Sequence, residues 1–196
     1  MRQAVIALRV RGGQGQAMRI LGWLLTTVAT VGLLALASRV AIPATPPMSP
    51  VPITLQTLAV TLAGALLGWR HGALAVALWL ACGAAGLPVL ADGGAGLAKF
   101  TGASAGYLFA FPVAAAAVGA LMAGGWNRSW PLAIAAMLAG NALCLAGGAA
   151  WLAWQGSVAH AWAVGVAPFL IGAALKAVAG GLFARWLAAN GFRTPR

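Results

Sequence analysis

The sequence predicts an all-α integral membrane protein that crosses the bilayer six times. Of its 196 residues, 62% are hydrophobic and only 7% are charged, which is too little polar surface to cover a water-soluble globule. The mean hydropathy is +0.93. Because one helical crossing takes roughly 20 apolar residues, this length accommodates about six crossings joined by short loops. No room is left for a second, soluble domain.

Hydropathy divides the chain into a basic N-terminal arm (1–19), a single membrane domain (20–187) and a basic C-terminal tail (188–196). We expect the crossings at residues 20–42, 53–69, 73–90, 107–122, 131–154 and 168–187. Between the second and third crossings, Arg70-His71-Gly72 predicts a tight basic turn. The three longest connections each follow an odd-numbered crossing, so they share one side of the membrane; they are residues 43–52, 88–106 and 155–167.

Cations are concentrated on the side opposite these loops. That side collects Arg2, Arg9, Arg11, Arg19, Arg70, Arg128, Arg185, Arg193 and Arg196. The loop side has only Arg39 and Lys99, partly offset by Asp92. The positive-inside rule therefore predicts that both termini are cytoplasmic. A nucleic-acid surface is not indicated, because the cations lie at the ends of apolar runs rather than together on one solvated face.

The stretch Pro50–Trp69 begins as a stiff, extended segment and continues as an apolar helix. Pro50 and Pro52 fix their own φ angles and bias the residues before them toward extended geometry. Thr54 and Gln56 then place polar groups at the start of the helix. Because this segment lies on the outer side, we expect it to cover a pocket there.

Lys176 is a cation inside the last apolar run. It lies eight residues after Pro168, or roughly 12 Å below the outer end of the helix at about 1.5 Å per residue. A charge this deep costs about 2.5–3.5 kcal/mol on insertion scales, so it requires a partner or a watery cavity. The candidates are Asp92, which is the only acid in the chain, a ligand carboxylate or a lipid head group. We therefore expect Lys176 to be functional.

Catalytic and metal-binding sites are not predicted. Residues 102–106 match the pattern GxSxG, but no acid follows Ser104, so a hydrolase triad in the usual chain order is impossible. His71 and His160 fall on opposite sides of the membrane and cannot share a metal. No nucleotide-binding motif is present.

Several ordered motifs resemble one family of membrane proteins. Residues 50–58 (PVPITLQTL), followed by Leu62-Ala63-Gly64 and Leu67-Gly68, closely resemble the signature of the biotin transporter substrate-binding component (BioY) family. Gly86-Leu87-Pro88-Val89, Gly106-Tyr107-Leu108 with Phe111, and Pro168-Phe169 with Gly172 and Lys176 continue the match in the family's order. The resemblance covers about residues 20–187.

This resemblance implies the fold and role of an S component of an energy-coupling-factor (ECF) transporter. Such a protein would bind biotin with high affinity beneath its outer loops, in the inner membrane of a bacterium, without a cofactor. A transmembrane coupling subunit and ATPase subunits would be its partners, and ATP hydrolysis would occur on them. The implied substrate-binding residues are Thr54, Gln56, Asp92, Ser104, Tyr107 and Lys176.

Two further features follow from the same comparison of motifs. The family usually has Asp three residues before the lysine, where this chain has Ala173, so Asp92 becomes a candidate for the compensating anion. Ala37 and Ala41 give the first helix an AxxxA spacing, which resembles the surface on which S components dock the coupling subunit. Helix packing within the protein explains this spacing equally well.

Three other functions remain open at this stage. An S component for another vitamin, such as thiamine, would share the architecture. A membrane enzyme that uses Ser104 would react with serine-directed probes, and a purely structural membrane subunit would bind no small molecule. The sequence also leaves open whether the protein transports alone or only with coupling and ATPase subunits.

Overall fold

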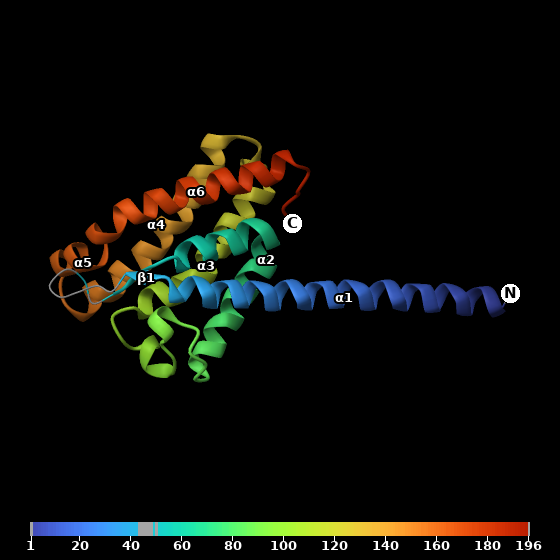
Figure 1. Cartoon of the computed structure of the whole chain (residues 1–196), viewed down its shortest axis with the longest axis horizontal. Helices are drawn as coiled ribbons and strands as arrows, with labels where there is room; N and C mark the ends of the chain where they lie inside the picture. Colours follow the sequence, from blue (N-terminus) through green and yellow to red (C-terminus); the bar gives the residue numbers. More distant parts are fainter. Residues whose placement is uncertain (1, 43–48, 50, 196) are drawn as a thin grey trace.

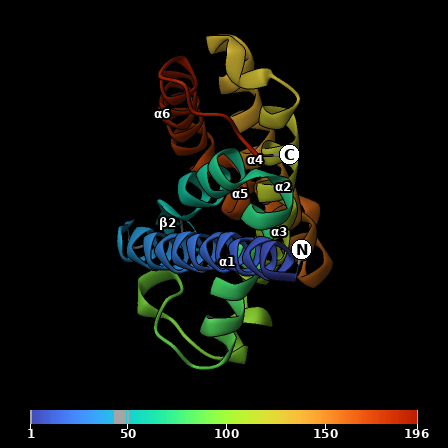
Figure 2. The same ribbon diagram turned by 90° about the vertical axis from the view of Figure 1, so that its right-hand side faces the viewer.

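The computed structural model describes residues 2–42, 49 and 51–195, with side chains for residues 16, 18, 20–41, 49 and 51–195. Its helices are α1 (Arg2–Arg39), α2 (Gln56–Ala84), α3 (Ala105–Ala123), α4 (Trp130–Gln155), α5 (Val158–Gly165) and α6 (Leu170–Ala189). Short 3₁₀ helices η1 (Ala91–Gly93), η2 (Leu97–Phe100), η3 (Trp126–Arg128) and η4 (Ala167–Phe169) lie in the connections. Helix α1 runs along one flank of the bundle, and its N-terminal part projects beyond it (Figures 1 and 2).

Five helical segments of the described chain are long and apolar enough to cross a membrane. They are Ile20–Arg39, Gln56–Ala84, Ala105–Ala123, Trp130–Gln155 and Val158–Ala189. Exposed apolar side chains such as Leu25, Val28 and Leu36 on α1 suit contact with lipid. The protein is thus an all-helical, multi-pass membrane protein, as the composition predicts.

Helix α2 contains a sharp break that replaces the predicted turn at 70–72. Gly68 has φ 78° and ψ 176°, a conformation that glycine adopts without steric cost. The second arm of α2 folds back on the first. The two arms approach so closely that a Cβ atom on Gly72 would lie 2.7 Å from the Cα of Gly64. The predicted position of the turn was wrong because Arg70 and His71 continue the helix, and only the glycine supplies the positive φ. Figure 1 shows the two arms running in different directions.

The connection predicted as a loop at 155–167 is mostly helical. Ser157 caps α5, and its side-chain oxygen accepts a hydrogen bond of 3.2 Å from the backbone N–H of His160. A serine at this position satisfies one of the free N–H groups of the first helical turn. Helix α6 then begins at Leu170, after η4.

A pair of two-residue strands joins the end of α1 to the start of α2. Strand β1 (Ala41–Ile42) pairs antiparallel with β2 (Ile53–Thr54), with Ala41 opposite Thr54. The first crossing was predicted to continue as helix to residue 42, but the helix ends at Arg39. Of the predicted proline-rich loop, residues 43–48 and Pro50 lie outside the described part of the chain.

Glycines bring the helix backbones into direct contact. Gly64 on α2 faces the carbonyl group of Ala115 on α3, and a Cβ at Gly181 on α6 would lie 2.7 Å from the Cα of Ile134 on α4. Such close approach is how membrane helices gain packing energy without a hydrophobic driving force.

We expect Gly64→Val to destabilise the protein by about 1–3 kcal/mol, the usual cost of overpacking. The added side chain would collide with the Ala115 carbonyl, which belongs to a helix backbone and cannot turn aside. Thermal unfolding of the detergent-purified variant would measure the effect. Gly32→Val is the matched control, because nothing lies within 4 Å of a Cβ at Gly32. An unchanged melting temperature for Gly64→Val would contradict the prediction.

Candidate functional site

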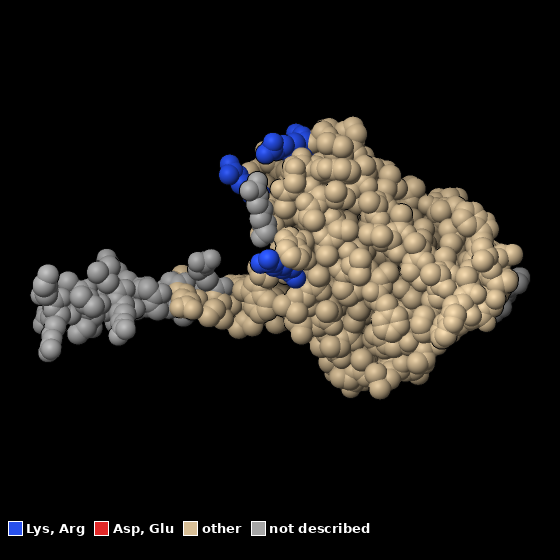
Figure 3. Space-filling view, turned by 180° about the vertical axis from the view of Figure 1, so that it is seen from behind, with Lys and Arg blue, Asp and Glu red and all other residues tan. Residues whose placement is uncertain are grey.

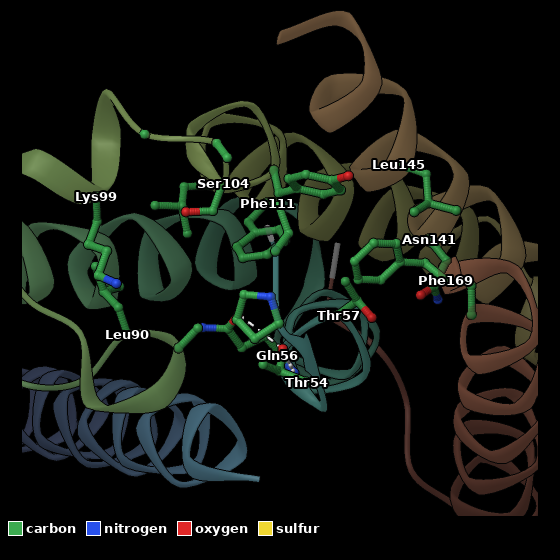
Figure 4. Close-up of a pocket in the computed structure, with 18 of the residues that line it drawn as sticks. Thr54, Gln56, Thr57, Leu90, Lys99, Ser104, Phe111, Asn141, Leu145 and Phe169 are labelled. Carbon is green, nitrogen blue, oxygen red and sulfur yellow. Dashed lines mark hydrogen bonds between the residues drawn. The ribbon is translucent and has the colours of Figure 1, made fainter. Parts of the chain in front are cut away.

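A cavity of about 370 Å³ lies among the starts of α2, α3 and α6 and the middle of α4. This volume is within the range of small-molecule sites, about 300–1,000 Å³. Its lining is mainly apolar and aromatic, with a few polar groups at separate points. The lining residues are Val51, Pro52, Thr54, Gln56, Thr57, Leu90, Ala91, Ala98, Lys99, Gly102, Ala103, Ser104, Tyr107, Leu108, Phe111, Asn141, Leu145, Phe169, Ala173 and Lys176. Figure 4 shows this cavity.

The structure brings five of the six predicted substrate-binding residues to this cavity. They are Thr54, Gln56, Ser104, Tyr107 and Lys176. Asp92 is not among the lining residues; it is exposed, with φ 55°, while its neighbour Ala91 reaches the cavity. Asp92 is therefore not positioned as the counter-ion of Lys176.

Lys176 is joined by hydrogen bonds to the segment that begins α2. Its Nζ donates to the backbone carbonyl of Thr54 at 3.1 Å. The Thr54 hydroxyl donates to Oε1 of Gln56 at 3.0 Å, and Nε2 of Gln56 donates to the Ser38 hydroxyl at 3.0 Å. The Ser38 hydroxyl in turn donates to the Leu34 carbonyl at 2.7 Å. This network links α6, β2, α2 and α1 beside the cavity.

Gln56 and Ser38 are buried, so their partners matter energetically. Gln56 is 5% exposed and Ser38 is fully buried. A buried polar group without a hydrogen bond costs about 1–3 kcal/mol. The structure satisfies both side chains from within the protein, which makes Gln56 a structural connector of the cavity wall.

Aromatic side chains form the apolar wall of the cavity. The rings of Tyr107 and Phe169 lie 6.0 Å apart, and Phe111 stacks on Trp79 at 6.0 Å. The Tyr107 hydroxyl donates to the carbonyl of Gly165, which satisfies its polar end. Tyr107 thus presents mainly its ring to a ligand.

Sequence reasoning missed three polar residues that line the cavity: Thr57, Lys99 and Asn141. Asn141 is 2% exposed, and its Nδ2 donates to the Met137 carbonyl at 3.0 Å, which leaves its side-chain oxygen available as an acceptor. The Thr57 hydroxyl is buried and has no partner within the described residues. Lys99 and Asn141 lie on opposite sides of the cavity (Figure 4).

The segment between α2 and α3 covers the cavity and is fixed by contacts to three helices. Nη2 of Arg39 donates to the Pro88 carbonyl at 2.8 Å, and the N–H of Gly96 donates to the Gly83 carbonyl at 2.7 Å. Nε1 of Trp151 donates to the carbonyl of Gly102 at 3.0 Å. The cover is therefore anchored to α1, α2 and α4.

The two alanines predicted for partner docking lie on different elements. Ala37 is on α1, where it is half-buried and packs against the core. Ala41 is on β1, beyond the end of the helix. The two residues therefore do not share one helix face.

These features define a class: a multi-pass membrane protein whose helices line a ligand-sized cavity with polar groups at both ends. The BioY family model matches residues 14–191, so the chain belongs to the BioY family. This is a family of transport proteins, not of enzymes.

Individual relatives agree with this assignment. The chain is 50% identical to the biotin transporter BioY of Rhodobacter capsulatus over 95 residues, which are 48% of this chain and 49% of that protein. It is 41% identical to the biotin transporter BioY of Thermotoga maritima over 87 residues, 44% and 52% of the two chains. The chain thus spans about half the length of these curated relatives in the matched segments.

A solved structure is similar over nearly the whole length. It is the crystal structure of the S-component for biotin from an ECF-type ABC transporter. The TM-score is 0.79 at 27% sequence identity, and the match covers 89% of this chain and 95% of the other. The fold is therefore that of an ECF S component.

Proposed function

We propose that this chain is a high-affinity biotin-binding S component that mediates biotin uptake, located in the inner membrane of a bacterium. Membership of the BioY family supports the proposal. The observation that carries it is the position of Lys176, a cation in a membrane helix that lines a cavity of about 370 Å³. A deep cation beside a ligand-sized cavity suits a ligand with strongly accepting oxygens.

The polar groups of the cavity suggest how biotin would lie. Its carboxylate is the group most costly to remove from water, which favours the side of Lys99, an exposed residue. The neutral ureido ring would occupy the side of Asn141 and Lys176, where its carbonyl oxygen accepts from Nζ. The free side-chain oxygen of Asn141 would accept from a ureido N–H group. This oxygen would take the place of the acidic side chain that the family usually has where this chain has Ala173.

Six crossings with both termini in the cytoplasm fit the arrangement of the chain. The start of α1 and the end of the chain lie toward the same end of the bundle (Figure 1), which requires an even number of crossings. The reversal at Gly68, which divides α2 into two arms, would supply the sixth crossing. On the face in Figure 3, Lys and Arg side chains gather at the end from which α1 projects, the pattern of a cytoplasmic side.

Transport would use a coupling subunit and ATPase subunits as partners. The similar solved structure is that of an S-component from an ECF-type ABC transporter, which supports this part of the proposal. In this chain, the exposed side of α1 that carries Leu33 and Leu36 is the proposed docking surface, and ATP hydrolysis would occur on the partner subunits.

Ligand retention tests the proposed function. Protein purified in detergent should retain tritiated biotin, which unlabelled biotin should displace and thiamine should not. Displacement by thiamine would assign the protein to another vitamin. Monodisperse, folded protein that retains no biotin would contradict the proposal, and modification of Ser104 by a serine-reactive probe would favour the enzyme alternative.

The orientation of the ligand gives a separate prediction for Lys99. We expect Lys99→Met to weaken biotin binding by roughly tenfold, because a charge-assisted hydrogen bond to the carboxylate contributes about 1.5–3 kcal/mol. The same substitution should leave the affinity for biotin methyl ester nearly unchanged. Calorimetric titration of both ligands would measure this. An equal loss for acid and ester would show that Lys99 does not face the carboxylate.

A further inference from the structure

A second cleft, of about 640 Å³, lies at the other end of the bundle from the cavity proposed to bind biotin, which is called the biotin cavity below. It is bounded by the ends of α3 and α6, by η3 and by the C-terminal segment; its lining residues include Met122, Asn127, Arg128, Arg185, Phe192, Arg193 and Thr194. The first cavity involves the starts of α3 and α6. The two sites are therefore separated by the length of the membrane helices.

Three arginines from distant parts of the sequence meet in this cleft. Arg128 is on η3, Arg185 is on α6 and Arg193 is in the C-terminal segment. This segment is held in place, since the Thr194 hydroxyl donates to the Ala65 carbonyl at 2.8 Å and accepts from Nδ2 of Asn127 at 3.5 Å. The cleft is thus formed by fixed elements rather than by a loose tail.

The positive charge of the cleft has no acidic side chain to balance it. The chain contains one acid, Asp92, which lies on η1 in the segment that covers the biotin cavity. Arg185 is oriented by the ring of Trp130, 5.3 Å from its guanidinium carbon. Its Nε atom is buried and, within the described residues, donates to no acceptor. This N–H is covered by protein, but the other guanidinium N–H groups of Arg185, which lines the cleft, remain as donors for an acceptor from outside the chain.

The depth of the cleft indicates where such an acceptor comes from. Trp130 and Trp186 are 45% and 54% exposed beside it, and tryptophan favours the level of the lipid head groups. Head-group phosphates lie at this level, and arginine binds phosphate through two parallel N–H donors. Basic pockets between membrane helices bind anionic lipid head groups in this way.

We propose that the cleft formed by Arg128, Arg185 and Arg193 is a phosphate site that binds the head group of an anionic phospholipid. The site is independent of the biotin cavity, so its test does not depend on the function proposed above.

Delipidated protein in detergent would be titrated with phosphatidylglycerol, phosphatidylcholine or inorganic phosphate. Bound lipid would be counted by native mass spectrometry and stability followed by thermal unfolding. We expect phosphatidylglycerol to bind and raise the melting temperature, and phosphatidylcholine to do so much less. Arg128→Gln with Arg193→Gln should reduce the phosphatidylglycerol affinity by about tenfold or more, because two charge-assisted contacts are lost.

Arg70→Gln is the matched control. Arg70 is an exposed arginine that stacks on Trp69 and does not line the cleft, so its loss should leave phosphatidylglycerol binding nearly unchanged. Arg128→Gln alone provides a milder variant if the double variant does not fold. Arg185→Lys keeps the charge but removes the planar guanidinium with its paired N–H donors, and it should also weaken binding.

Three results would contradict the proposal. Equal phosphatidylglycerol affinity of the wild type and a folded cleft variant would show that the cleft is not the site. An equal loss with Arg70→Gln would show that only the overall charge matters. Stabilisation by inorganic phosphate as strong as that by phosphatidylglycerol, and lost in the cleft variants, would retain the phosphate site but reject the lipid as its ligand.

Discussion

Lys176→Met is expected to weaken biotin binding by roughly 10- to 100-fold. A hydrogen bond to a charged group contributes about 1.5–3 kcal/mol, and each 1.4 kcal/mol is a factor of about ten in affinity. Methionine preserves the length and most of the volume of the side chain while it removes the ammonium group. Calorimetric titration or retention of tritiated biotin would measure the change.

The ligand itself provides the control for this substitution. If Lys176 faces the ureido carbonyl, Lys176→Met should lower the affinities for biotin and biotin methyl ester by the same factor, in contrast to Lys99→Met. A loss confined to the free acid would reverse the proposed orientation. Unchanged affinity for both ligands would remove Lys176 from the binding site. Thermal unfolding would separate these results from misfolding, since Nζ of Lys176 also holds the Thr54 carbonyl.

Gln56→Leu is expected to speed biotin release by about tenfold and to lower stability by about 1–3 kcal/mol. The substitution leaves the Thr54 and Ser38 hydroxyls without the amide that now connects them at 3.0 Å on each side. The start of α2 would then be less firmly tied to α1. A chase of bound tritiated biotin with unlabelled biotin would measure the dissociation rate.

A double-mutant cycle tests whether this connection is the cause. Ser38→Ala should have a smaller effect of the same kind, and Ser38→Ala with Gln56→Leu should cost less than the sum of the two, because both remove the same hydrogen bond. Gln16→Leu is the control, because this glutamine is exposed on α1 and does not line the cavity. Additive effects would show that the Ser38–Gln56 contact is not responsible.

The sequence predicts the class of fold well and its reversals less well. Long apolar runs correctly place α3 and α4, because a bilayer requires about 20 apolar residues in each. Helix α1 instead begins at Arg2, so most of the predicted N-terminal arm continues the first helix. The break in α2 falls at Gly68 rather than at 70–72, since hydropathy cannot show which of several glycines has a positive φ. Helix α5 was missed, although Ser157 before an apolar run is a helix-start signal.

The cavity was also predicted in part. Thr54, Gln56 and Lys176 are polar residues at the edge or inside apolar runs, and such residues stand out in a membrane protein. Asn141 gives the same signal within the fifth predicted crossing and could have been found by the same rule. Thr57 could not, because a threonine in a membrane helix commonly bonds to its own backbone, and only the fold places this residue at the cavity.

The bond between Lys176 and the Thr54 carbonyl has a consequence for how biotin would leave. An ammonium group has three N–H donors, and in the described structure one of them holds the carbonyl of β2 at 3.1 Å. A biotin oxygen can accept from another of these donors, so biotin and β2 would be bound to the same nitrogen atom. Separation of β2 from α6 would then weaken the contact between Lys176 and biotin at the same time. Any partner that moves α6 relative to α1 could thus convert its own motion directly into release.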